Sequence, residues 1–113
     1  MTDNELIELS AKSIGIELVY QGGAAGYYRD FGDCVAWLAW DPIVDGADAM
    51  RLVAVLGLQL KGDVVTCATG LHSCQVERGA DADLATMNVC RAIAGVAADI
   101  GRVMDVDNLR VAG

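Results

Sequence analysis

Apolar residues recur every three or four positions in three stretches of the chain, and this helical period predicts three helices. Each stretch follows a polar residue that can cap the first turn, and a glycine lies just past the end of the first two. The predicted helices cover about residues 3–14, 46–56 and 82–104, with Thr2 or Asp3, Asp45 and Asp81 as N-caps.

Short apolar runs rich in branched and aromatic residues lie between the helices and predict strands, because glycine and aspartate bound them. The turn sequences Gly32-Asp33 and Gly62-Asp63 are typical of hairpins. The predicted strands cover residues 16–20, 27–31, 34–40, 58–61, 64–69 and 72–78. The run 34–40 is apolar on both faces, so we expect a central strand that is covered on both sides.

The order helix, strands, helix, strands, helix indicates an α+β fold, in which helices pack on a mostly antiparallel sheet. A ferredoxin-like split unit is the alternative. Because 113 residues support a single hydrophobic core, we expect one domain over residues 1–113. Its last part, about residues 105–113, is predicted to be a short tail with one edge strand at residues 109–112.

The last predicted helix carries its polar residues on one narrow stripe. Asn88, Arg91, Asp99 and Arg102, with Gly95 among them, recur every three or four positions, and the positions between them are apolar. A helix that is polar on so thin a stripe is buried over most of its circumference. Its cover is either the rest of the chain or a second copy, so a homodimer is among the expected partners.

Composition adds a sharp division between interior and surface. The chain is 54% hydrophobic, yet 8 basic against 16 acidic side chains give a formal net charge of −8. This charge disfavours nucleic acid and anionic membranes as partners. The N-terminus is polar and acidic, unlike a secretion signal, so we expect a soluble cytoplasmic protein whose four cysteines are reduced thiols.

The sixteen carboxylates also raise the idea of an acidic protein that mimics nucleic acid. Such mimicry needs its charges along one face. Many of the carboxylates fall instead at predicted turns and caps, where aspartate is favoured for local hydrogen bonds. These are Asp33, Asp41, Asp45, Asp63 and Asp81. An ordinary acidic surface is the favoured interpretation, and mimicry is a third hypothesis for the function.

The residues best suited to chemistry are Cys67, His72 and Cys74, which lie close together in the sequence. Zinc sites usually contain cysteine or histidine pairs a few residues apart. Here Cys67 and Cys74 are seven positions apart, and His72 is the only histidine, so no such pair is present. Residue types alone also allow a cysteine nucleophile with His72 as its base. We predict no catalytic residue, metal or cofactor, and a small Cys/His enzyme or ligand binder is the alternative.

All aromatic residues lie between Tyr20 and Trp40. Packing inside the sheet is the simpler interpretation. Because tyrosine, tryptophan and arginine dominate the binding energy of protein interfaces, the alternative is that some of these side chains contact a partner. The candidate partner-binding residues are Tyr27, Tyr28, Arg29, Trp40, Arg91 and Arg102.

Three segments resemble one protein family. They are residues 6–18, which contain Ala11-Lys12 and Gly15-Ile16-Glu17-Leu18; Trp40-Asp41-Pro42 followed by Asp45, Asp48, Ala49, Arg51 and Leu52; and the alanine-rich residues 91–102. They are similar to the AAK-GIEL start, the W-[ND]-P-x-x-D-x-x-D-A-x-R-L segment and the alanine-rich closing helix of small accessory proteins from tailed phages and prophages. The sequence differs at residues 22–26 and 67–74, where that family is itself variable.

The resemblance spans nearly the whole chain and implies an α/β sandwich and a role in the cytoplasm of a bacterial host. It implies no activity, because the family has no established catalytic or binding residues. The residues themselves give the central segment a structural role, since Asp41-Pro42 enforces a turn between a strand and a helix. The leading hypothesis is therefore non-catalytic binding of a host protein, with inhibition of an antiphage defence as its narrower form.

Overall fold

The computed structural model describes residues 1–112, with side chains up to residue 104. It contains the helices α1 (Asp3–Ser13), α2 (Gly46–Leu56) and α3 (Ala82–Ala112). The strands β1 (Gly26–Asp30) and β2 (Val35–Ala39) form one antiparallel sheet, and β3 (Gln59–Lys61), β4 (Val64–Thr66) and β5 (Ser73–Gln75) form a second, in the order β3-β4-β5. The predicted α+β class, with helices packed on antiparallel strands, is confirmed.

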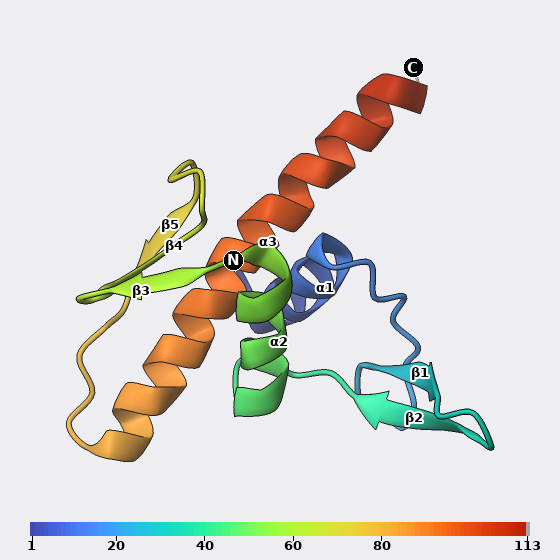
Figure 1. The fold of residues 1–113 in the computed structure, drawn as a ribbon. Coiled ribbons are helices and arrows are strands. Elements are labelled where there is room, and N and C mark those ends of the chain that lie inside the picture. The colour runs from blue at the N-terminus through green and yellow to red at the C-terminus, as the bar shows by residue number, and fades with distance from the viewer. Residues whose placement is uncertain (113) are drawn as a thin grey trace.

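The two sheets lie on opposite sides of the helices (Figure 1). α3 runs diagonally through the molecule, with α1 and α2 packed beside it. The β3-β4-β5 sheet contacts α3, and the β1-β2 hairpin stands apart on the other side. Every strand described pairs only with its neighbour in the sequence, so the ferredoxin-like alternative is wrong.

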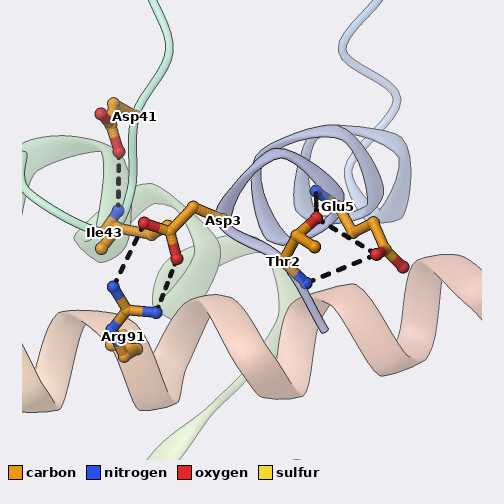
Figure 2. Close-up of polar contacts among 6 residues, drawn as sticks. All are labelled: Thr2, Asp3, Glu5, Asp41, Ile43 and Arg91. Atoms are coloured by element: carbon orange, nitrogen blue, oxygen red, sulfur yellow. Dashed lines mark hydrogen bonds and ion pairs between the residues drawn. The ribbon is translucent and has the colours of Figure 1, made fainter.

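Local hydrogen bonds explain where the first two helices begin and end. Thr2 caps α1, since its Oγ1 accepts from the N–H of Glu5 at 3.2 Å and the Glu5 carboxylate accepts from the Thr2 N–H at 3.4 Å (Figure 2). Asp45 caps α2 by accepting from two N–H groups of its first turn. α2 ends at Gly57, whose φ of 66° lies in the left-handed region that favours glycine. These limits confirm the predicted helices.

One predicted strand is absent, and another lies at an edge instead of at the centre of a sheet. Residues 16–20 form no strand, because the N–H of Ile16 donates back to the carbonyl of Ala11, and Val19 contributes one bond to Gly26 of β1. Residues 34–40 contain β2, but this strand lies at the edge of a two-stranded sheet, with Val35 63% exposed. The described helices pack on one another and on the other sheet, so they leave the outer face of β2 uncovered.

α3 begins as predicted but ends later. Asp81 caps it by accepting from the N–H of Leu84 at 2.8 Å. The helix continues to Ala112, so the expected tail and its edge strand at residues 109–112 are wrong, and Gly113 lies outside the described residues. The polar residues after 104 suggested a tail, but no glycine or proline occurs among residues 105–112 to end the helix.

The middle of α3 is the centre of the core. Its buried residues are Cys90, Ala92, Ile93, Ala94, Val96, Ala97 and Ala98. The rest of the same chain covers them, chiefly α1, α2, β4 and β5. Residues Ala82–Met104 are long and apolar enough to cross a membrane, but 44% of their most apolar window is buried inside the protein, and core helices meet the same criterion.

Candidate interaction surface

The β1-β2 hairpin has one face toward the core and one toward solvent. Tyr28 stands opposite Trp37, and Tyr27 stands opposite Leu38. Because side chains alternate along a strand, Tyr27 and Leu38 share one face, while Tyr28, Val35 and Trp37 share the other. Tyr27 is 9% exposed and packs with Leu38 on the main core, so their face points inward. The opposite face exposes more than half of Tyr28 and of Val35.

Two tryptophans fix the base of the hairpin. Trp40 is 1% exposed, and its indole N–H donates to the carbonyl of Ile7 in α1 at 3.1 Å. Trp37 is half-buried, and its indole N–H donates to the carbonyl of Val19 at 2.9 Å. Both bonds anchor the hairpin through buried or half-buried rings, and the end of the hairpin that carries the turn extends away from them.

The family-like central segment joins the hairpin to α2. The carboxylate of Asp41 accepts from the N–H of Ile43 at 3.2 Å, which forms the turn between them (Figure 2). The carboxylate of Asp48 accepts from the N–H of Asp41 at 2.9 Å, and burial raises the pKa of Asp48. Arg51 donates to the hydroxyl of Tyr27 and lies 5.3 Å from the centre of its ring. These contacts support the structural role predicted for the segment.

The free end of the hairpin exposes aromatic, apolar and cationic groups on both of its faces. Phe31 is half exposed, and the guanidinium of Arg29 lies 5.2 Å from the centre of its ring. The Tyr28 hydroxyl accepts from the side chain of Gln21 at 2.7 Å, yet half of Tyr28 stays exposed. Arg29 and Phe31 share one face of the hairpin, whereas Tyr28 and Val35 share the other. Single exposed apolar residues are ordinary, but an exposed aromatic ring beside an arginine is typical of protein interfaces. We call Tyr28, Arg29, Phe31 and Val35 the hairpin surface.

The structure separates the six predicted partner-binding residues. Tyr28 and Arg29 belong to the hairpin surface. Tyr27 and Trp40 require a correction, because both side chains are buried in the core, where their rings pack edge to face at 6.3 Å. Their burial removes them from any surface of the folded chain.

The two remaining candidates, Arg91 and Arg102, are exposed on α3 and do not join the hairpin surface. The guanidinium of Arg91 lies 2.8 Å from the carboxylate of Asp3 and lowers its pKa (Figure 2). An exposed ion pair of this kind contributes little to stability.

Sequence reasoning missed Phe31 and Val35 as surface residues. It assigned both segments to a covered sheet, so their apolar character indicated the interior. The turn at Gly32-Asp33 carried the opposite signal, because residues that flank a hairpin turn lie farthest from the base where the hairpin is anchored.

Cys67, His72 and Cys74 belong to β5 and the turn before it. The Sγ of Cys67 lies 3.1 Å from the hydroxyl of Thr69, and the side chain is almost buried. Hydrogen bonds from the Thr69 hydroxyl and the His72 N–H lower the pKa of Cys67 to about 7. Burial raises the pKa of Cys74. Among the side chains up to residue 104, no three His, Cys, Asp or Glu residues stand close enough to hold a metal ion.

Several carboxylates accept hydrogen bonds from nearby backbone amides. Besides the caps of the three helices, Asp30 accepts from the N–H of Gly32 at 2.8 Å, inside the turn of the hairpin. Carboxylates used in this way follow the local needs of turns and caps. This distribution favours an ordinary acidic surface over the regular row of charges that mimicry requires.

Comparison with known proteins does not assign a family. A scan against models of protein families, a search of curated proteins and a search of solved structures each found no match. The similarity to phage accessory proteins therefore stays a prediction that rests on the three segments described above.

Proposed function

We propose that the protein acts by non-catalytic binding of another protein through the hairpin surface. The observation that carries this proposal is the exposed pair of Arg29 and Phe31 at the turn end of a hairpin whose base is fixed by two tryptophans, with Tyr28 and Val35 exposed on its other face. Aromatic and arginine side chains on a pre-ordered element bind with little loss of conformational entropy.

The charge around the hairpin surface indicates the chemistry of the partner. Asp30 and Asp33 are exposed beside Phe31, and the whole chain carries a net charge of −8. A complementary partner has an apolar pocket for the Phe31 ring with lysine or arginine around it. The similarity to phage accessory proteins suggests a host protein in this role, and inhibition of an antiphage defence is the narrower form of the proposal.

Two matched double variants test the hairpin surface. Arg29→Ala with Phe31→Ala removes its cation and ring, and Arg78→Ala with Leu71→Ala removes an exposed arginine and an exposed leucine elsewhere. Host proteins captured from bacterial lysate by the wild type are identified by mass spectrometry, and the affinity of the purified partner is then measured. We expect the hairpin variant to weaken binding by about tenfold or more, and the control to bind like the wild type.

Two controls complete this experiment. Circular dichroism verifies that both double variants fold. Equal binding by the two variants would refute the hairpin surface as the binding site. If no protein from host lysate binds the wild type, the proposal of a host partner would be refuted.

A second candidate function is thiol chemistry at Cys67, which its lowered pKa of about 7 favours. Against it, the Cys67 residue is only 8% exposed, and within the described residues no hydrogen bond joins the His72 imidazole to its sulfur. Thiol titration and a metal assay of the purified protein decide between the two functions. One hyper-reactive cysteine or bound zinc would favour the enzyme or ligand binder.

A further inference from the structure

The geometry points to one specific partner for the hairpin. We propose that the open edge of β2 pairs with the same edge of a second copy of this chain, so that two hairpins join into one four-stranded antiparallel sheet. This inference goes beyond the proposed function, in which the hairpin binds a host protein. It uses the backbone edge of β2, whereas the binding of a host protein uses the turn end of the hairpin.

The hydrogen bonds of the hairpin show which backbone groups of β2 are free. Cys34 and Trp40, which flank β2, both bond toward the β1 side, at 2.8 and 2.9 Å. Backbone groups alternate between the two sides of a strand, so Val35, Trp37 and Ala39 present their N–H and C=O groups away from β1. In the described part of the chain, β2 pairs with β1 alone and these groups form no other backbone hydrogen bond.

β2 lacks the features that normally protect a free edge. Proteins guard such edges with charged side chains, proline or bulges, because an unguarded edge pairs with other chains. The sequence Val-Ala-Trp-Leu-Ala contains none of these residues. In the other sheet, the edge strand β3 ends in Lys61. The outer edge of β1 already receives a bond from Val19 to Gly26 at 2.7 Å, so β2 carries the open edge of the hairpin.

Trp37, the largest side chain of β2, does not block this edge. The Trp37 ring leans toward β1 and covers Gly26, where a Cβ would overlap the ring. Its indole N–H is held by the Val19 carbonyl on the same side. The residues on either side of it along the open edge, Val35 and Ala39, are small and exposed. A second strand can therefore approach without displacing the tryptophan.

β2 is complementary to itself. When two copies pair antiparallel about a twofold axis at Trp37, Val35 of each copy stands opposite Ala39 of the other. All these pairings join residues whose backbone groups face outward, so each becomes a hydrogen-bonded pair that exchanges two bonds. Every free group along the edge of β2 is then used in both copies, and no charged side chain lies between them. Twofold pairing is also the commonest symmetry of protein oligomers.

Charge gives self-pairing a distinctive dependence on salt. Each copy carries a net charge of −8, and pairing about Trp37 brings Asp33 of one copy toward Asp41 of the other. Added salt screens this repulsion, so the dimer should tighten as salt is added. A basic strand bound to the same edge would instead bind more weakly, because salt screens its attraction.

Sedimentation equilibrium in the micromolar range tests the proposal with one variant and a matched control. Val35 and Val55 are similarly exposed, 63% and 59%, but Val55 lies on α2. We expect the wild type and Val55→Glu to reach twice the mass of one chain. Val35→Glu should raise the dissociation constant by about tenfold or more, because it adds a carboxylate beside the pair of Asp33 and Asp41, and the twofold axis places it there twice.

Amide hydrogen exchange measured by NMR locates the interface. The amides of Val35, Trp37 and Ala39 should become protected as the protein concentration rises, whereas those of Ala36 and Leu38, which face β1, should not change. A wild type that stays monomeric, a Val35→Glu variant that dimerises as tightly as the control, or a dimer without this protection overturns the proposal.

The outcomes also separate this inference from the proposed function. A monomer that captures a host protein, with capture lost in the Arg29→Ala with Phe31→Ala variant, would refute self-pairing and leave the proposed function standing. A dimer with the protected edge, combined with equal host binding by the two double variants of the earlier experiment, would establish self-pairing and refute binding through the turn end.

Discussion

An alanine at Gly101 and an alanine at Gly95 would place the same methyl group on the same helix in two different surroundings. At Gly101 the methyl would overlap the backbone carbonyl of Leu9, because α1 and α3 touch there through their backbones. A backbone carbonyl inside a packed helix cannot move alone, so the two helices would have to separate. At Gly95 the methyl would lie 3.5 Å from the Sγ of Cys74, which is an ordinary contact distance.

The two substitutions are expected to change the free energy of unfolding in opposite directions. Alanine is favoured over glycine in a helix interior by about 1 kcal/mol, and at Gly95 nothing opposes this gain. At Gly101 overpacking costs about 1–3 kcal/mol, and overlap with a backbone atom places the cost near the upper end. We expect Gly95→Ala to stabilise by about 0.5–1 kcal/mol, and Gly101→Ala to destabilise by about 1–2 kcal/mol. For a chain of this size, 1 kcal/mol corresponds to roughly 4 °C in Tm.

Urea and thermal unfolding, followed by circular dichroism at one protein concentration, measure both variants against the wild type. The two substitutions change neither charge nor the number of polar groups, so each is the control for the other. If Gly101→Ala proved as stable as Gly95→Ala, then α1 and α3 would not be in backbone contact, and the described packing of the core would be wrong.

Three further predictions concern polar contacts. Trp40→Phe removes the N–H that bonds to Ile7 and should lower the free energy of unfolding in urea by about 1–3 kcal/mol. Thr69→Val removes the hydroxyl that lowers the pKa of Cys67, so the midpoint of Cys67 alkylation against pH, followed by mass spectrometry, should rise above about 7. Burial raises the pKa of Asp48, so the folded chain binds this proton more tightly than the unfolded chain does. The wild type therefore loses stability as the pH rises and the Asp48 carboxyl ionises. Asp48→Asn, compared in urea at acidic and neutral pH, should therefore gain stability relative to the wild type as pH rises.

Each of these predictions has a contradicting result. Unchanged stability of Trp40→Phe would mean that its bond to α1 contributes nothing. An unchanged alkylation midpoint in Thr69→Val would show that the hydroxyl does not stabilise the Cys67 thiolate. A constant difference between Asp48→Asn and the wild type across the pH range would show that this carboxyl titrates alike in the folded and unfolded chains.

The helix limits were predictable because capping is decided within a single turn. Thr2, Asp45 and Asp81 each bond to amides two or three residues ahead, so the signal lies in the local sequence. The cover of β2 was not predictable in this way. An apolar strand of this kind has the same sequence pattern in the covered centre of a sheet and at its edge. Which of the two positions it takes depends on long-range packing.

The surface was predictable in part. The aromatic cluster correctly drew attention to residues 27–40, but it could not decide which of Tyr27 and Tyr28 faces the core. These neighbours point to opposite faces of β1, and the choice is made by Arg51 and Trp40, which pack on Tyr27. Phe31 was missed because its exposure follows from its distance beyond the tryptophan anchors, which a linear pattern does not contain.

The packing of α1 against α3 also sets an order of events during synthesis. The pair Asp3 and Arg91, which spans these helices, is separated by 88 residues. At typical rates of translation, α1 leaves the ribosome on the order of ten seconds before the helix that covers it. Both hairpins have local pairings and can form within microseconds of emerging. The nascent chain therefore carries an uncovered apolar helix face for most of its synthesis, and chaperones can recognise that face until α3 closes the core.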